Sequence, residues 1–425
     1  MDVRLIKDYI TVFLKREPLK LVKRDLVIKT VPNKATVIIG PRRAGKTSLM
    51  WEIISTYDRS RTIYLDFEDI ALMGVSATDA LRIITEIFTE ISGKEANTVF
   101  LDEIQNVVNW QSLIRTLLDR GYTVFVTGST SKLLSREIAT QLRGRSLSFL
   151  LLPFSFKEFL SAKNEYPPLV SSFTDIGLLK RHLLEYLDFG GYPEVVLGKQ
   201  EREKLISEYR DMIFLKDFVE REKIKSIDVG RFIFSFVTQA FSSELSSRNV
   251  LNALKQRGIP FGRNTLYGYI EKLQDTMIFF FLERYSTKVK LRTTWPRKVY
   301  LADTGLAWRI ANDRGRLIEN AVFLELKRRQ GLSPLSEIYS YKDTADHEID
   351  FLIKEREKIV KLIQVTYASN RNDIKDREVN NLITASLELH CNDLLIITWD
   401  YEAVETVKGK KIKFIPLWKW LLNLN

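Results

Sequence analysis

Short apolar runs that end in glycine or in acidic and hydroxyl residues recur along the N-terminal part of the chain. Val37–Ile39 ends at Gly40, and the apolar run Val99–Leu101 ends at Asp102-Glu103. Continuous apolar runs are typical of parallel strands that are buried on both faces, and the segments between such strands have the apolar period of helices. The pattern predicts an α/β domain over residues 1–152. Its strands are expected at Val37–Ile39, Thr62–Phe67, Val99–Asp102, Thr123–Thr130 and Ser146–Leu152.

The next stretch, residues 153–225, has the 3.6-residue apolar period of helices rather than the pattern of strands. Gly190-Gly191-Tyr192-Pro193 interrupts it and is interpreted as a turn between helices. We therefore predict a helical segment, with helices at Phe154–Leu160, Leu178–Phe189 and Glu203–Glu222.

Residues 226–296 have the layout of a winged helix-turn-helix. The expected recognition helix, Arg263–Gln274, follows a turn at Gly258–Gly262. Strands at Met277–Tyr285 and Lys288–Thr293 would form the wing. Four side chains of the recognition helix are candidates to contact DNA phosphates or base edges, namely Arg263, Asn264, Tyr267 and Lys272. Winged helices also serve as protein-binding modules, and the sequence leaves both roles open.

The last stretch, residues 297–425, alternates predicted strands and helices around a long helix at Arg316–Gln330. Two strands flank the acidic turn 343–348, and a third follows at Ile359–Tyr367. We interpret this stretch as a separate α/β domain. Its further strands are expected at Leu394–Thr398 and Lys411–Leu417, with a closing helix at Trp418–Leu422.

The composition narrows the class of protein. The 425 residues are 45% hydrophobic, which suffices for large cores, and the net charge of +11 favours polyanionic partners such as nucleic acid. One cysteine, Cys391, excludes an internal disulfide framework, and three histidines exclude the common zinc patterns. The N-terminus does not have the pattern of a signal peptide, and the apolar runs are too short to span a bilayer. We expect a cytoplasmic protein without a membrane partner.

The most informative motif lies between the first strand and the helix after it. It matches the phosphate-binding pattern G-x-x-x-x-G-K-[ST] in the required strand–loop–helix context. Backbone N–H groups of such a loop hold phosphate, the lysine reaches the β- and γ-phosphates, and the hydroxyl binds Mg²⁺. The motif predicts ATP and Mg²⁺ as ligands. The contacts are expected from Gly40, Pro41, Arg42, Arg43, Ala44, Gly45, Lys46, Thr47 and Ser48.

An acidic pair, Asp102-Glu103, ends the third predicted strand. Asp102 is placed to hold the Mg²⁺ ion together with Thr47, and Glu103 is placed to polarise the attacking water. Ser129 and Thr127, at the end of the next strand, are candidates to sense the γ-phosphate, although a simple Thr-Gly-Ser turn would also explain them. Together these residues indicate hydrolysis of the nucleotide.

Several other charged residues have two interpretations each. Arg145, with Arg143 in reserve, is the preferred arginine to stabilise charge at the γ-phosphate, in cis or from a neighbouring subunit; the alternative is a solvated basic turn. Glu68 and Asp69 face the nucleotide or cap a turn. The basic segment Lys20–Lys29 flanks the nucleotide or packs as an arm.

Five segments, in this order and spacing, resemble archaeal and bacterial AAA-type ATPases of unknown biological role: GPRRAGKTSL, FLDEIQ, TGST, LRGR and LLPFSFKEFL. The resemblance covers most of the chain. It implies a five-stranded αβα core with nucleotide at the strand ends, a helical lid, a winged helix and a C-terminal domain similar to restriction endonucleases. Arg221 would be a weak candidate for a second sensor in the lid.

The last domain resembles the PD-(D/E)xK nuclease core, with one departure. Glu319 and Asp350 match the helix Glu and the strand Asp, and Glu348 shares the strand face of Asp350. Gln364 and Thr366 stand where that core has Glu and Lys. A neutral ligand and a missing ammonium would weaken metal binding and water activation. We therefore expect that this domain does not cut DNA efficiently.

Three functions remain open at this point. The first is an ATPase whose hydrolysis of ATP to ADP is coupled to DNA through the winged helix and the C-terminal domain. The second is an ATP-gated nuclease in defence or element mobility. The third is a signalling ATPase that binds a protein client. Self-association is compatible with each of them.

Overall fold

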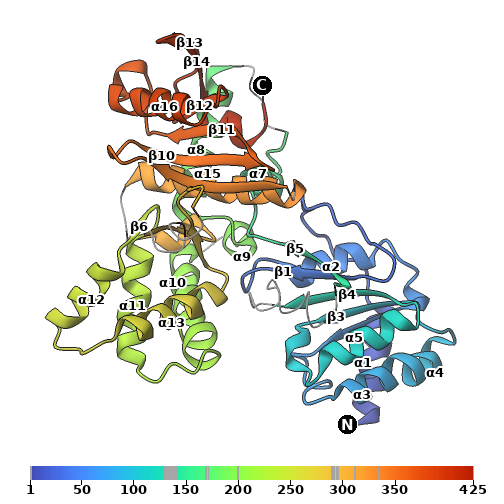
Figure 1. The fold of residues 1–425 in the computed structure, drawn as a ribbon. Helices are drawn as coiled ribbons and strands as arrows, with labels where there is room; N and C mark the ends of the chain where they lie inside the picture. The colour runs from blue at the N-terminus through green and yellow to red at the C-terminus, as the bar shows by residue number, and fades with distance from the viewer. Residues whose placement is uncertain are drawn as a thin grey trace. The chain divides into compact units, whose positions relative to one another are not determined.

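The computed structural model describes residues 2–128, 142, 144–167, 170, 172–198, 201–288, 292, 296–310, 313–333 and 335–424. The chain forms two compact units, Met1–Leu151 and Leu152–Asn425. Figure 1 shows that each unit contains a sheet with helices packed on it. No helix within the described ranges is long and apolar enough to cross a membrane.

The first unit contains a five-stranded sheet in which every neighbouring pair is parallel, in the order β2-β3-β4-β1-β5. The structure thus confirms the predicted parallel α/β core. The central strands are buried on both faces, which explains why they appear in the sequence as continuous apolar runs. The strands are β1 (Ala35–Ile39), β2 (Thr62–Asp66), β3 (Thr98–Asp102), β4 (Thr123–Gly128) and β5 (Ser146–Leu150).

Helices cover both faces of this sheet because alternate side chains of each strand point to opposite sides. Ile38 packs with Trp51 on one face, whereas Val37 and Ile39 pack with Ile114 on the other. Figure 1 shows α2 on one side of the sheet and α3, α4 and α5 on the opposite side, whereas α1 contributes Phe13 to the core on the α2 side and Ile6 and Ile10 to the core on the other. The helices are α1 (Val3–Lys15), α2 (Lys46–Ile54), α3 (Ala77–Arg82), α4 (Phe88–Ser92) and α5 (Trp110–Asp119).

The second unit begins with helices, and its glycine turn packs around a buried carboxylate. Gly190 has a φ of 77°, and the N–H groups of Gly191 and Gly305 donate to Asp303 at 2.6 and 2.9 Å. Gly190-Gly191 therefore serves as a structural turn. The helices are α7 (Phe156–Ala162), α8 (Phe173–Phe189), α9 (Pro193–Leu197) and α10 (Arg202–Met212), followed by a π-helical segment at Ile213–Glu220.

Three helices and a three-stranded antiparallel sheet follow, in the strand order β6-β8-β7. The third strand, β8, lies at 297–301, where the sequence pattern had suggested the start of the next domain. Pairing explains the difference, because Leu301 and Val299 are fully buried opposite Phe279 and Phe281. The predicted wing strand at 288–293 lies largely outside the described residues. The elements are α11 (Ile227–Gln239), β6 (Ser243–Leu245), α12 (Ser247–Gln256), α13 (Arg263–Asp275), β7 (Phe279–Leu282) and β8 (Arg297–Leu301).

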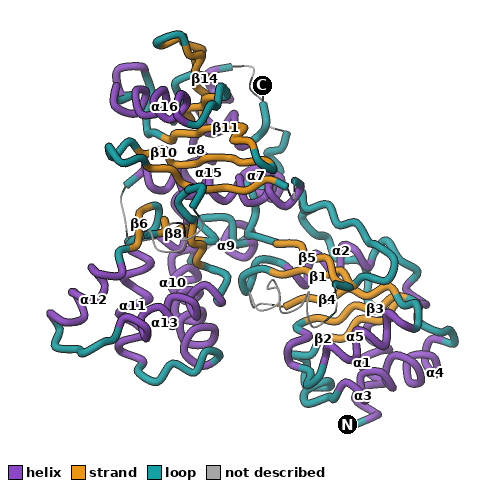
Figure 2. The backbone as a smooth tube through the Cα atoms, viewed as in Figure 1, coloured by secondary structure: helices purple, strands orange, loops and turns teal. Residues whose placement is uncertain are grey.

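The C-terminal part contains a mixed six-stranded sheet in the order β13-β14-β12-β11-β10-β9. Figure 2 shows its strands (orange) with helices (purple) beside them. The sequence analysis missed β13, a half-exposed edge strand joined to β14 by a turn at Lys408-Gly409. The elements are α15 (Arg314–Leu332), β9 (Ser336–Lys342), β10 (Glu348–Glu355), β11 (Lys358–Val365), α16 (Asp376–Glu388), β12 (Leu394–Thr398), β13 (Ala403–Val407), β14 (Lys410–Pro416) and α17 (Leu417–Leu421).

Candidate functional site

The loop between β1 and α2 has a backbone that requires glycine at two positions. Gly45 caps α2 with a φ of 96°, a conformation that side chains with a Cβ rarely adopt. A Cβ on Gly40 would lie 2.0 Å from the carbonyl oxygen of Leu151. These constraints hold the N–H groups at the start of α2 around the loop, where an anion is favoured.

Lys46 is buried at the base of this loop. Its Nζ donates to the carbonyl oxygens of Gly40 and Pro41 at 3.2 Å each and lies 3.6 Å from Glu103 Oε1. Only 5% of the side chain is exposed. The ammonium thus lies between the loop and the carboxylate expected to polarise water.

Asp102, at the end of β3, is held by three hydroxyl groups. Thr47 Oγ1 donates to Asp102 Oδ2 at 2.7 Å, Tyr64 OH donates to the same oxygen at 2.8 Å, and Thr127 Oγ1 donates to Oδ1. A carboxylate accepts but does not donate hydrogen bonds, so this set fixes its orientation. Thr47 and Asp102, the two residues expected to hold Mg²⁺, are in direct contact. This donor set of oxygens fits Mg²⁺.

Glu103 has the strained backbone often found at functional sites. Its φ is 49°, in the left-handed region, and its N–H donates to Thr127 Oγ1 at 3.0 Å. The carboxylate accepts from the side-chain amide of Gln105 and faces Lys46. Thr127 therefore orients both acids, and its fully buried hydroxyl is engaged by them. The role of Thr127 as a γ-phosphate sensor stays a prediction.

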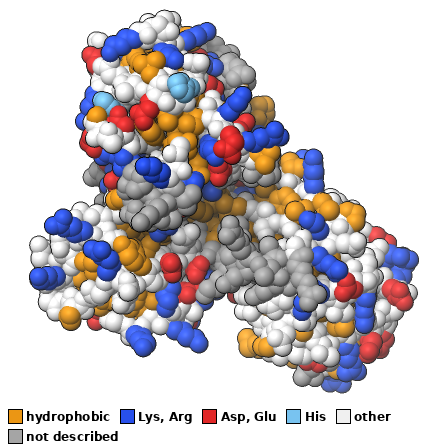
Figure 3. All heavy atoms as spheres, in the orientation of Figure 1, with side chains coloured by type: hydrophobic (Ala, Val, Ile, Leu, Met, Phe, Trp, Pro, Cys, Tyr) orange, Lys and Arg blue, Asp and Glu red, His pale blue; other side chains and the backbone are white. Residues whose placement is uncertain are grey.

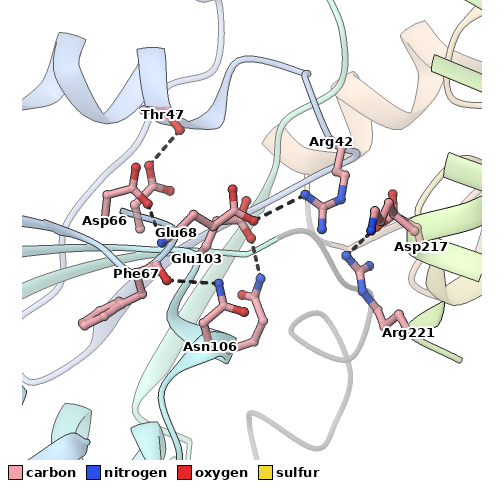
Figure 4. Close-up of polar contacts among 12 residues, drawn as sticks. Arg42, Thr47, Asp66, Phe67, Glu68, Glu103, Asn106, Asp217 and Arg221 are labelled. Atoms are coloured by element: carbon pink, nitrogen blue, oxygen red, sulfur yellow. Dashed lines mark hydrogen bonds and ion pairs between the residues drawn. The ribbon is translucent and has the colours of Figure 1, made fainter. Parts of the chain in front are cut away.

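Three acids lie at or directly after the end of β2, and Figure 4 shows two of them, Asp66 and Glu68. Glu68 Oε1 lies 3.4 Å from Arg42 Nη1, so Glu68 faces the loop. Asp69 instead accepts from the N–H of Ala71 and caps a turn. Asp66 of β2 lies opposite Asp102 in the register of the β2–β3 strand pair. Burial raises the pKa of Asp66 to about 6, and the negative charge of Asp102 adds to this effect. The hydrogen bond from the N–H of Glu68 acts in the opposite direction and lowers the pKa.

Residues that the sequence analysis missed complete this site. Tyr64 and Asp66 come from β2, and only the pairing of β2 with β3 brings them to Asp102, so the sequence carried no signal for them. Arg24 is buried and donates from Nη1 to the carbonyl oxygen of Ala44 at 2.9 Å. The basic segment 20–29 therefore contacts the loop, which its sequence pattern had left undecided.

The prediction that Arg145 acts on the nucleotide in cis is wrong. Arg145 precedes β5 at the edge of the sheet where β1 begins, whereas the loop follows the end of β1. The two edges are roughly 16 Å apart for a five-residue strand. The guanidinium instead pairs with Asp119. Ser129 and Arg143 lie outside the described residues.

The expected C-terminal site residues come together around an unexpected lysine. Lys298 Nζ, from β8, lies 3.1 Å from Glu319, 2.9 Å from Glu348 and 2.8 Å from Asp350. Gln364 is adjacent, with its Oε1 3.4 Å from the N–H of Asp350. A lysine from β8, a strand distant in the sequence, therefore lies among these three acids.

The candidate nucleic-acid contacts on α13 lie on different faces. Arg263, Asn264 and Tyr267 are exposed. Lys272 is half-buried and donates to the carbonyl oxygen of Glu222 at 2.5 Å. Lys272 follows Arg263 by nine residues, which places it on the opposite side of the helix. The prediction that Lys272 shares this contact surface is therefore wrong.

Comparison with known proteins gives three family matches along the chain. Residues 32–160 match an AAA domain, residues 180–316 match a domain of unknown function (DUF8612), and residues 314–420 match another (DUF4143). The AAA match covers the loop, Lys46 and both acids of the site.

Two relatives extend over nearly the whole chain. The uncharacterized protein MJ1544 of Methanocaldococcus jannaschii is 38% identical over 414 residues, 95% of this chain and 92% of that protein. An uncharacterized protein of Haemophilus influenzae is 28% identical over 90% of this chain and 93% of its own length. A solved structure of Cdc6p from Pyrobaculum aerophilum aligns over 58% of this chain and 80% of its own length, with 10% identity and a TM-score of 0.27.

Proposed function

The chain belongs to the same family as MJ1544, and its residues 32–160 match an AAA domain. We therefore propose that it hydrolyses ATP with Mg²⁺ and couples hydrolysis to nucleic acid. One observation carries the first part of the proposal. Lys46 contacts Glu103, Thr47 contacts Asp102, and Thr127 links the two acids, so the lysine, Thr47 and both acids form one connected set. These are the groups that phosphoryl transfer to water requires.

Each residue of the set has a distinct role in the proposal. Lys46 and the loop N–H groups bind the phosphates, and Thr47 with Asp102 holds Mg²⁺. The ion neutralises charge on the phosphates when bound. Glu103 orients and polarises the attacking water, with its carboxylate positioned by Gln105. Tyr64 and Thr127 act as positioning residues for Asp102.

The proposal is tested by measuring phosphate release by the full-length protein. We expect turnover with ATP and Mg²⁺ and none with EDTA, because Thr47 and Asp102 then lack the ion that they hold. Addition of duplex or single-stranded DNA is expected to raise the rate. A rate unchanged by either DNA, with turnover intact, would favour the protein-client alternative. Absence of Mg²⁺-dependent turnover under all conditions would contradict the ATPase assignment.

The nucleic-acid part of the proposal is supported by the module that contains α11, α12 and α13. Its three helices and three-stranded antiparallel sheet have the layout of a winged helix. Figure 3 shows Lys and Arg side chains (blue) at the surface of this part of the chain. The exposed cations of α12, the following turn and the start of α13 are Arg248, Lys255, Arg257 and Arg263. These groups, rather than Lys272, would contact phosphates.

We expect binding to DNA that weakens as salt rises, because phosphate contacts release counterions. Replacing Arg257 and Arg263 together by Ala should reduce the slope of log K against log salt by about 1 for each phosphate that is no longer neutralised. Fluorescence anisotropy with a labelled duplex between low and physiological salt measures the slope.

The matched control replaces Lys204 and Lys216 by Ala. Both are exposed and lie outside this module, and both contact acids within their own helical segments. The same slope in the control and in wild-type protein is expected. An equal reduction of slope in the two double variants would show that binding reflects net charge rather than this module.

We also propose that the C-terminal domain is nuclease-like. This assignment is supported by the approach of Glu319, Asp350 and Gln364 across α15, β10 and β11. We propose that this domain does not cut DNA efficiently, although Lys298 supplies a nearby ammonium. The reason is the position of that ammonium, which lies among the acids themselves.

A further inference from the structure

The C-terminal carboxylate cluster brings three elements together on one lysine. Glu319 comes from α15, Glu348 and Asp350 come from β10, and Lys298 comes from β8 of the three-stranded sheet. Lys298 is 5% exposed, Asp350 8% and Glu319 13%, whereas Glu348 is half-exposed at 40%. The cluster is thus largely enclosed, with an opening on the side of Glu348.

The ammonium lies at the point on which the three carboxylates converge. An ammonium has three N–H donors. Lys298 Nζ lies within 3.1 Å of one oxygen from each acid, so its donors match the three carboxylates. A metal ion bound by all three carboxylates would occupy the same position between them.

Protein donors also occupy other oxygens of the cluster. Glu319 Oε1 accepts from Tyr300 OH at 2.7 Å as well as from Lys298. Asp350 Oδ2 accepts from the N–H of Val365 at 3.0 Å. Gln364 Oε1 lies 3.4 Å from the N–H of Asp350, so its oxygen faces the backbone. A metal ion would have to displace these contacts.

The charges of the cluster are consistent with a resident ammonium. Burial opposes the charge of Lys298, but Asp350 and Glu319 outweigh it and raise the pKa of Lys298 well above its usual value. Burial and the neighbouring Asp350 raise the pKa of Glu319 to about 7, against the opposing charge of Lys298. The lysine therefore stays charged at neutral pH.

We propose that Lys298 is the resident cation of this cluster and stands in place of the divalent metal that nuclease-like domains use. The residues present do not fit such a metal, because its position is taken by an ammonium and Gln364 is a neutral side chain that faces the backbone. The same contacts fasten β8, and with it the three-stranded sheet, to α15 and β10. The cluster therefore joins two parts of the second unit.

The test compares Mn²⁺ binding to full-length wild-type protein and to three variants, without nucleotide, by EPR of free Mn²⁺. Wild-type protein and Asp350→Asn should bind equal amounts of Mn²⁺. Lys298→Met keeps a side chain of similar length without the charge, so it should gain one site. That site should be absent from Lys298→Met/Asp350→Asn.

Thermal unfolding gives a second readout. Lys298→Met leaves buried carboxylates without their cation, so its melting temperature should fall by about 5–15 °C. Mn²⁺ should restore part of this stability in Lys298→Met and leave wild-type protein unchanged.

Two results would overturn the proposal. One is a Mn²⁺ site in wild-type protein that Asp350→Asn removes, since the lysine would then coexist with a metal. The other is a folded Lys298→Met variant that gains no Mn²⁺ site. If Lys298→Met does not fold, the comparison of wild-type protein with Asp350→Asn still shows whether the wild-type cluster binds Mn²⁺. Plasmid cleavage by wild-type protein with Mn²⁺, abolished in Asp350→Asn, would also refute the proposal.

Discussion

Replacing Glu103 with Gln is expected to lower ATP turnover by about 10²–10⁴-fold while ATP binding is retained. Glutamine keeps the size of the side chain and can still contact Gln105. It lacks the negative charge that faces Lys46 at 3.6 Å and that would polarise water. Binding should persist because the loop and Lys46 remain. Turnover is measured by phosphate release and binding by a fluorescent ATP analogue.

Lys46→Ala is the companion variant, because it removes the ammonium and leaves Glu103 in place. We expect it to lose nucleotide binding as well as turnover. Glu103→Gln and Lys46→Ala should therefore separate the two functions of the site. Wild-type turnover in Glu103→Gln would mean that another group activates water. Weak binding in Glu103→Gln would show that the acid mainly holds the loop.

Replacing Gly190 with Ala is expected to destabilise the second unit strongly. A Cβ there would lie 1.6 Å from Asp303 Oδ1, and the φ of 77° is strained for alanine. Asp303 is buried and accepts from two backbone N–H groups, so it cannot move without leaving them unpaired. With ψ at −166°, this backbone conformation is essentially restricted to glycine and costs another residue about 1–3 kcal/mol. Unpaired buried groups add about 1–3 kcal/mol. The melting temperature of this unit should fall by about 5–15 °C.

Gly177→Ala provides the matched control. Gly177 lies within α8, where a Cβ would meet no atom within 4 Å. Alanine is the better helix former, so this variant should be neutral or slightly more stable. Differential scanning calorimetry distinguishes the two. Similar melting temperatures for Gly190→Ala and Gly177→Ala would show that the turn around Asp303 tolerates a side chain.

The sequence by itself determined the parallel core and the positions of Lys46, Thr47 and Asp102. These features depend on local order, since a strand, a glycine loop and a helix follow one another directly. A parallel strand that ends in an acid also places that acid at the same edge of the sheet as the loop. The turn at Gly258–Gly262 likewise located the start of α13 without a tertiary structure.

Only the tertiary structure decided which distant side chains share a site. Tyr64 reaches Asp102 because β2 lies beside β3. Lys298 lies on the central strand of the three-stranded sheet, and its side chain reaches Asp350 of β10 in the other sheet. Strand neighbours are set by packing, and no spacing in the sequence records them. Register placed Arg145 at the far edge of the sheet, and the contact with Glu222 turned Lys272 away from the surface. The sequence showed which chemical groups the chain carries and where they occur, whereas the contacts of each side chain depended on how strands and helices assemble.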